Sequence, residues 1–456
     1  MPLPRSPLRH VSPAWSFTLP LTAILVLAFL VRLILSPMPG NEFDVGVNQG
    51  WARSAVQLGF GPSYSRQVNG NMLPNYPPLS MLIFGGVGRV YSMIVPDMRP
   101  TPLFTILIKL PAIVADMATA LLLAFMIGRW KGRAAGVLGG FIYAVHPAVI
   151  YDSAVWGQTD SLFTFAMIAG LAAWSRGWTA MSAFLCACAV LLKAQTVMLL
   201  PLFALLFTLR GPKALLLSAC AGIGAVTLTL LPYAGHVSSV FAVYRGSVGY
   251  YPIVSSAAYN LWWALLGDSA GTLADTTLFF SLMPYRTLGM LIYATVTGIV
   301  LGILTPLLRY EKNPARAYIL VSSAGAVMAF AFFLFNTEMH ERYLFPFLAL
   351  GLPMCFIHPR GAFIYAGISI CFLWNLFGWL PFMTIDQSMF RNFPALDIFI
   401  ASAQVFLFYG MVRFLAQWVR RLLRSLPEDI AKLPTWKDWI DWTQMIAKFL
   451  ASGRAR

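Results

Sequence analysis

Long apolar runs alternate with short polar segments along most of the chain. Several runs reach or approach the roughly 20 residues that a helix needs to cross a bilayer. Runs of this length and low polarity predict transmembrane helices rather than helices on the surface of a soluble protein. They cover residues 17–35, 103–127, 214–231, 288–308, 317–335 and 362–380.

The succession of apolar runs and turns predicts the fold class and the number of membrane crossings. We expect an all-α protein, a polytopic transmembrane helical bundle with about 12 or 13 crossings. Two alternatives concern residues 78–127: residues 78–96 are re-entrant, or a neighbouring run breaks at Pro111. The predicted helices are 18–36, 103–127, 134–150, 159–175, 178–194, 196–210, 213–232, 287–308, 316–336, 343–357, 361–381 and 396–416.

Two long polar segments and a tail interrupt this pattern. Residues 37–77 are the first outer loop, in which we expect a short helix at 46–60. Loops of this length are usually functional or disordered, and their aromatic residues favour an ordered loop. Residues 233–286 are a second large outer segment. The chain is thus expected to form one transmembrane module, 1–416, followed by an amphipathic tail on the cytoplasmic surface, 417–456.

Composition agrees with a membrane protein. The chain of 456 residues is 59% hydrophobic and 11% charged, with a mean hydropathy of +0.71. Its net charge of +15 reflects lysines and arginines that fall mostly in segments on one side of the predicted membrane. The positive-inside rule makes that side cytoplasmic, so the charge does not indicate nucleic-acid binding. Most carboxylates fall on the other side, where we therefore expect any chemistry.

The segment 336–345 has the strongest functional signal. It places carboxylates, a histidine and an arginine between two apolar runs. A charge at membrane depth costs ~2.5–3.5 kcal/mol, so a cluster at the boundary indicates a use. His340 and Arg342 are candidates for phosphate binding, because the arginine fork suits phosphate oxygens. The structural alternative is an ion pair of Arg342 with Glu338 or Glu341.

The first outer loop begins with two acids, Glu42 and Asp44. Asp44 is a candidate general base that takes a proton from an attacking hydroxyl. Two alternatives remain open: a solvated loop acid, and a divalent cation that Asp44 shares with Glu42 through oxygen ligands.

Further candidates lie in three short motifs on the same side. Each has a structural alternative: a rigid Pro-Pro turn after Tyr76, an interfacial aromatic belt for Trp156, a helix cap for Asp160, and a snorkelling side chain for Lys193. The chain has no Walker A loop, dinucleotide fingerprint, His-Glu-x-x-His motif or Cys/His metal spacing. The candidates are Tyr76, Trp156, Gln158, Asp160, Lys193 and Gln195.

In this order the motifs resemble the GT-C superfamily of membrane glycosyltransferases, over residues 40–346. The nearest likeness is to dolichyl-phosphate-glucose glucosyltransferases and bacterial GPI-type mannosyltransferase homologues. The resemblance rests on the acid of the first loop, Tyr-Pro-Pro-Leu at 76–79, Asp116, Trp-Gly-Gln-Thr-Asp at 156–160, Lys-Ala-Gln at 193–195 and His-Glu-Arg at 340–342.

The resemblance implies an inverting enzyme that moves a hexose, mannose or glucose, from a polyprenyl-phosphate carrier to a hydroxyl of a lipid-linked or other acceptor. The reaction would occur at the outer face of a membrane, and the expected membrane is the plasma membrane of a prokaryote. Asp44 would be the base, and His340, Arg342 and Lys193 would bind the donor phosphate. The remaining residues of the cavity would be Glu42, Tyr76, Trp156, Gln158, Asp160, Gln195 and Glu341.

No cofactor is expected. A lipid monophosphate leaving group needs cations and hydrogen-bond donors, whereas a nucleotide diphosphate would call more strongly for a metal, so a metal at Glu42 and Asp44 is not favoured. Two other classes remain: a transporter or flippase of a lipid-linked sugar, and a non-catalytic subunit. The enzyme hypothesis requires Asp44 and the basic pair near 340 to line one chamber.

Overall fold

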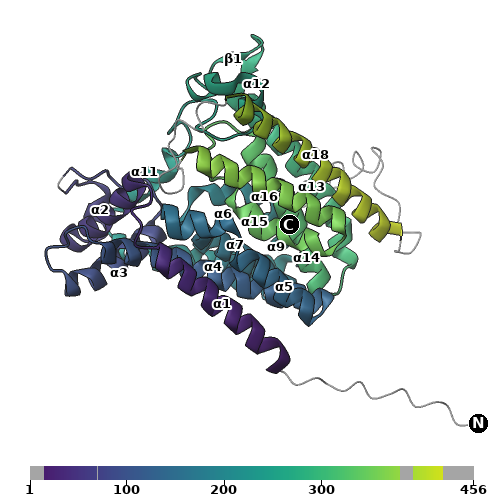
Figure 1. Cartoon of the computed structure of the whole chain (residues 1–456), viewed down its shortest axis with the longest axis horizontal. Coiled ribbons are helices and arrows are strands. Elements are labelled where there is room, and N and C mark those ends of the chain that lie inside the picture. Colours follow the sequence, from purple (N-terminus) through teal and green to yellow (C-terminus); the bar gives the residue numbers. More distant parts are fainter. Residues whose placement is uncertain (1–14, 69, 380–393, 425–456) are drawn as a thin grey trace, which may run out of the picture. The chain divides into compact units, whose positions relative to one another are not determined.

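The computed structural model describes residues 15–68, 70–379 and 394–424. These residues form α-helices and a small two-stranded antiparallel sheet, β1 (Leu278–Phe279) with β2 (Met283–Pro284). The described residues fall into two compact units that divide between Tyr409 and Gly410. The helices in Figure 1 are α1 Trp15–Leu35, α2 Glu42–Leu58, α3 Pro78–Ile94, α4 Pro102–Lys131, α5 Arg133–Ala144, α6 Pro147–Ile150, α7 Asp160–Ser175, α8 Thr179–Leu192, α9 Leu200–Leu209, α10 Pro212–Leu230, α11 Val237–Arg245, α12 Leu261–Leu266, α13 Tyr285–Tyr310, α14 Pro314–Phe335, α15 Phe345–Gly351, α16 Pro359–Trp379 and α18 Pro394–Arg424.

The helical character and the membrane class are as predicted. Within the described residues, six helices are long and apolar enough to cross a membrane: α4, α13, α14, α16, α18 and the helix that starts at Pro212. The pair Arg133–Ala144 and Pro147–Trp156, bent by 47°, makes up to seven if it is one span. The expected 12 or 13 crossings are therefore not reached by helices of spanning length alone, and would require shorter apolar helices such as α7 and α8 to cross as well.

Several predicted helices differ in detail from those observed. The helix expected at 134–150 breaks between α5 and α6, because Pro147 lacks an N–H group and disfavours helix at His146. The one expected at 196–210 is a 3₁₀ segment, Ala194–Leu199, followed by α9. Conversely, α4 continues through Pro111, so the alternative of a break there was wrong.

The first outer loop is ordered around a helix, as expected. This helix, α2, begins at Glu42, four residues before the predicted start, because the Asn41 side chain caps it by accepting from the Asp44 N–H. Figure 1 shows α2 beside α3, and their aromatic residues share one core. The ring centroid of Trp51 lies 5.2 Å from the ring centroid of Tyr76 and 6.0 Å from that of Phe84.

Buried charges connect α1, α4 and the segment 151–161. Arg32 of α1 donates to Asp116 of α4 at 3.1 Å, and both side chains are fully buried. Ser153 and Ser161 donate to the same carboxylate. This network ties α1 and α4 to the segment 151–161.

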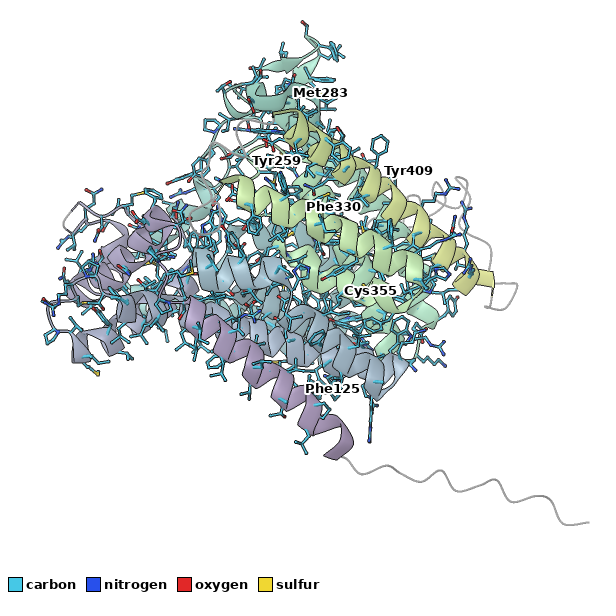
Figure 2. All side chains as sticks on the ribbon, viewed as in Figure 1. Phe125, Tyr259, Met283, Phe330, Cys355 and Tyr409 are labelled. Carbon is cyan, nitrogen blue, oxygen red and sulfur yellow. The ribbon has the colours of Figure 1, made fainter. Side chains whose placement is uncertain are left out.

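Aromatic side chains pack around α14. Phe330 of this helix, labelled in Figure 2, contacts the rings of Phe347 and Phe408.

Lys109 of α4 forms a second buried attachment. Its ammonium donates to the carbonyl oxygens of Met38, Ala154 and Val155 at 2.7, 3.0 and 2.9 Å. The segment after α1 and the segment before Trp156 are thereby held at one point.

The last described helix is longer than predicted. It was expected to end at residue 416, but α18 continues to Arg424, and the rest of the predicted amphipathic tail, residues 425–456, lies outside the described part of the chain.

Candidate active site

Asp44 occupies the first turn of α2 and is half-buried. Its Oδ2 accepts hydrogen bonds from the indole Nε1 of Trp156 at 2.8 Å and from the amide Nε2 of Gln158 at 2.7 Å. The helix N-terminus also favours a negative charge here. Glu42 is different, because its side chain is exposed. The structure thus gives Asp44 a fixed orientation and leaves Glu42 in an exposed position.

The segment that carries Trp156 and Gln158 has an unusual backbone. Residues Tyr151–Trp156 form a π-helical turn, a form that is frequent at functional sites. Gly157 then takes a φ of +92°, and a Cβ there would lie 2.8 Å from the side chain of Val45. Glycine is therefore required where the chain reverses from Trp156 to Gln158.

The His340-Glu341-Arg342 motif is compact, with His340 and Glu341 buried and Arg342 half-buried. Arg342 Nη1 lies 2.6 Å from Glu341 Oε1, and His340 Nδ1 lies 3.7 Å from Glu341 Oε2. Glu341 is 1% exposed and lies between its two neighbours. The predicted structural pair of Glu341 with Arg342 is present, whereas Glu338 pairs with Arg286 instead, at 3.2 Å.

The acid of the first loop and the arginine of this motif meet at one side chain. The guanidinium carbon of Arg342 lies 6.0 Å from the ring centroid of Trp156, whose indole N–H binds Asp44. Asp44 is also one of the groups that act electrostatically on Arg342. Residues separated by about 300 positions in the chain therefore belong to one cluster.

Lys193 extends this cluster on the side of α8. Its ammonium lies 2.9 Å from Asp160 Oδ1 and 5.8 Å from the ring centroid of Tyr343. The Arg342 guanidinium approaches the same ring at 5.7 Å, so two cations converge on Tyr343. The ring centroid of Tyr76 also lies near, 5.5 Å from the Lys193 ammonium.

Electrostatics give the members of the motif different protonation states. Burial raises the pKa of the Glu341 carboxyl, but the Arg342 guanidinium and His340 lower it more strongly, to about 2. Burial lowers the pKa of His340 below its ordinary value of 6.5. The charge of Arg342 lowers this pKa further, whereas Glu341 raises it. At neutral pH the motif therefore consists of a neutral imidazole, a carboxylate and a guanidinium.

The second outer segment covers this motif, a feature that local motifs did not reveal. The backbone N–H groups of Gly249 and Tyr251 donate to the Glu338 carboxylate at 2.9 and 3.2 Å. Arg286 also binds Asp275, at 2.7 Å. The Tyr251 ring consequently lies edge-on to His340, with centroids 4.6 Å apart. The outer segment thus contributes an aromatic side chain to the site.

Most of the predicted site residues gather in this cluster. Among the described residues, no group of three or more His, Cys, Asp or Glu side chains is arranged to hold a metal ion. Sequence reasoning did not select Asp152, which is fully buried on the π-helical turn. Its position between Tyr151 and Trp156 was the feature of the sequence that could have identified it. The predicted residues in the cluster are Asp44, Tyr76, Trp156, Gln158, Asp160, Lys193, His340, Glu341 and Arg342.

Comparisons with known proteins add no assignment. No protein-family model matches the chain, and no curated protein matches its sequence. The geometry of the site is therefore the main basis for a functional conclusion.

Glu341 makes the stability of the fold depend on pH. Its pKa is about 2, below the ordinary 4.5, so its contribution is complete above about pH 4.5 and is lost as the pH falls toward 2. We expect wild type to melt at higher temperature than Glu341→Gln near pH 7, and this difference to shrink at about pH 3. Fluorescence-detected melting in detergent measures it. Glu42→Gln, an exposed acid, is the control; a difference that does not change with pH would contradict the prediction.

Proposed function

We propose that this protein is an inverting, GT-C-type glycosyltransferase that moves a hexose, mannose or glucose, from a polyprenyl-phosphate carrier to a hydroxyl acceptor. The observation that carries the proposal is the Trp156 side chain, which binds the Asp44 carboxylate through its N–H and faces the Arg342 guanidinium with its ring. A fixed carboxylate and a half-buried cation that both interact with one indole are the two groups that such a transfer needs.

The chemistry assigns one role to each group. The acceptor hydroxyl attacks the anomeric carbon while the bond from that carbon to the phosphate oxygen breaks. The hydroxyl proton passes to Asp44, a general base that two donors hold in place. The electron pair leaves with the lipid phosphate, whose negative charge is stabilised by Arg342 and Lys193. Neutral His340 supplies a further hydrogen-bonding group, because its Nε2 has no partner within the described residues.

The substrates and the location follow from the same reasoning. The partners are a polyprenyl-phosphate-linked sugar, a lipid-linked or other hydroxyl acceptor, and membrane lipids. The reaction needs no cofactor. The charge distribution favours an active site on the outer face, in the plasma membrane of a prokaryote. The proposal takes the shorter apolar helices as membrane crossings too, which gives the total of about 12 or 13.

A transporter or flippase of a lipid-linked sugar is the alternative. It needs polar groups within the membrane that its cargo can use. The buried charges of α1 and α4 are engaged with the protein instead: Arg32 pairs with Asp116, and Lys109 donates to three carbonyl groups. These contacts favour a structural role for the interior charges. We therefore propose an enzyme rather than a transporter.

The decisive experiment supplies the purified protein with polyprenyl-phosphate mannose or glucose and analyses the lipid fraction by mass spectrometry. We expect wild type to transfer one of these sugars. Arg342→Ala should lose donor affinity by about 10- to 100-fold, because a charge-assisted hydrogen bond contributes ~1.5–3 kcal/mol. Arg245→Ala, an exposed arginine at the end of α11, is the matched control.

Two outcomes would count against the proposal. Sugar flipping across vesicles without transfer would support the transporter. An unchanged KM and kcat for the donor in Arg342→Ala would remove the assigned role of the arginine.

A further inference from the structure

Asp152 is a carboxylic acid in a costly position. Its side chain is fully buried on the π-helical turn, and within the described residues neither of its oxygens has a hydrogen-bond partner. Buried polar groups in folded proteins are almost always hydrogen-bonded, and an exception requires an explanation. A ligand that forms hydrogen bonds with both oxygens would supply one.

Two further polar side chains near Lys193 share this property. Asp160 is fully buried, and its Oδ2 has no partner, whereas its Oδ1 binds the Lys193 ammonium. Gln195, two residues after Lys193, is 8% exposed, and both polar atoms of its amide are without partners in the described chain. Unpartnered polar atoms therefore occur on the carboxyl group that binds Lys193 and on a residue two positions after Lys193 in the chain.

The charged surroundings of Asp152 indicate the same place. The groups that act on it electrostatically include Asp160, Lys193 and Arg342. Its backbone carbonyl also accepts from the N–H groups of Gly157 and Gln158, which belong to the loop that holds Asp44. Asp152 is thus coupled electrostatically to the proposed cations, and its backbone is hydrogen-bonded to the loop that binds the proposed base.

The chemistry of these atoms selects a ligand class. Carboxyl oxygens accept hydrogen bonds, a protonated carboxyl group also donates one, and an amide both accepts and donates. Neither a carboxyl group nor an amide carries the positive charge that binds phosphate well, so the phosphate itself is a poor ligand for them. Adjacent hydroxyl groups of a sugar ring instead both donate and accept, so they can pair with a carboxyl group and an amide. A hexose is therefore the best match, since its hydroxyls can satisfy acids and an amide together.

We propose that Asp152 binds hydroxyl groups of the donor's hexose, with Asp160 and Gln195 completing a sugar-binding subsite beside the phosphate cations. This inference rests on the proposed function, because it assigns the sugar part of the same donor. It makes Asp152 a determinant of affinity for the sugar and not for the lipid phosphate.

The test measures binding of two lipids to the full-length protein by ligand-dependent melting. The probes are polyprenyl phosphate and polyprenyl-phosphate mannose or glucose. We expect wild type to bind the glycosylated lipid more tightly, and Asp152→Asn to lose about 10- to 100-fold of affinity for it while keeping its affinity for polyprenyl phosphate. Asp97→Asn, an exposed acid between α3 and α4, is the matched control.

Each outcome is decisive. Equal weakening of both lipids by Asp152→Asn, no weakening of either, or no preference of wild type for the glycosylated lipid would overturn the inference. If Asp152→Asn does not fold, Gln195→Ala carries the test, and it should weaken only the glycosylated lipid. Failure of the proposed function has a different signature: intact, sugar-dependent binding with no transfer to any acceptor.

Discussion

Asp44→Asn is expected to lower the rate of sugar transfer by about 10²- to 10⁴-fold, the usual contribution of a general base. The asparagine side-chain oxygen can accept the hydrogen bonds that Trp156 and Gln158 donate to Asp44, at 2.8 and 2.7 Å. The fold and the donor affinity should therefore change little, because only the capacity to take a proton is removed. Initial rates of transfer, with KM for the donor and the melting temperature, measure the three effects separately.

Glu42→Gln is the comparison for this experiment. Glu42 is an exposed acid two residues from Asp44, so this variant should transfer sugar at nearly the wild-type rate. Equal losses in both variants would instead favour the shared divalent cation. Full activity of Asp44→Asn would remove Asp44 as the base.

Much of the helical pattern was predictable from the sequence. Long apolar runs are a local signal, so the predicted 316–336 and 287–308 lie within a few residues of α14 and α13. Breaks were harder to predict, because a proline ends one helix and is tolerated in another. Pro147 separates α5 from α6, whereas α4 continues through Pro111. Only the packing around each proline decides between these outcomes.

The candidate site was predictable as a list of residues but not as an arrangement. Asp44, Trp156 and Arg342 come from separate motifs, and their meeting at one indole depends on tertiary structure. The ion-pair partners of the acids also could not be predicted from the sequence. Glu338 and Glu341 were equal candidates for Arg342 in the sequence, but the second outer segment brings Arg286 to Glu338. The unpartnered oxygens of Asp152 have no sequence signature.

The second large effect concerns the buried pair of Arg32 and Asp116, which ties α1 and α4 to the segment before Trp156. Removing one partner leaves the other charge buried and uncompensated, at a cost of about 3–5 kcal/mol. We therefore expect Arg32→Met and Asp116→Leu each to lower the melting temperature strongly.

The double variant separates a pairing effect from general damage to the core. Arg32→Met with Asp116→Leu should be more stable than either single variant, because replacing both charges by apolar side chains removes the uncompensated charge. Melting of all four proteins in one detergent completes the cycle, and Asp97→Asn, which alters an exposed pair 4.0 Å apart, should change little. Additive losses in the double variant would show that the two charges act independently. In that case the hydroxyl groups of Ser153 and Ser161, rather than Arg32, would be the main partners that hold Asp116 in place.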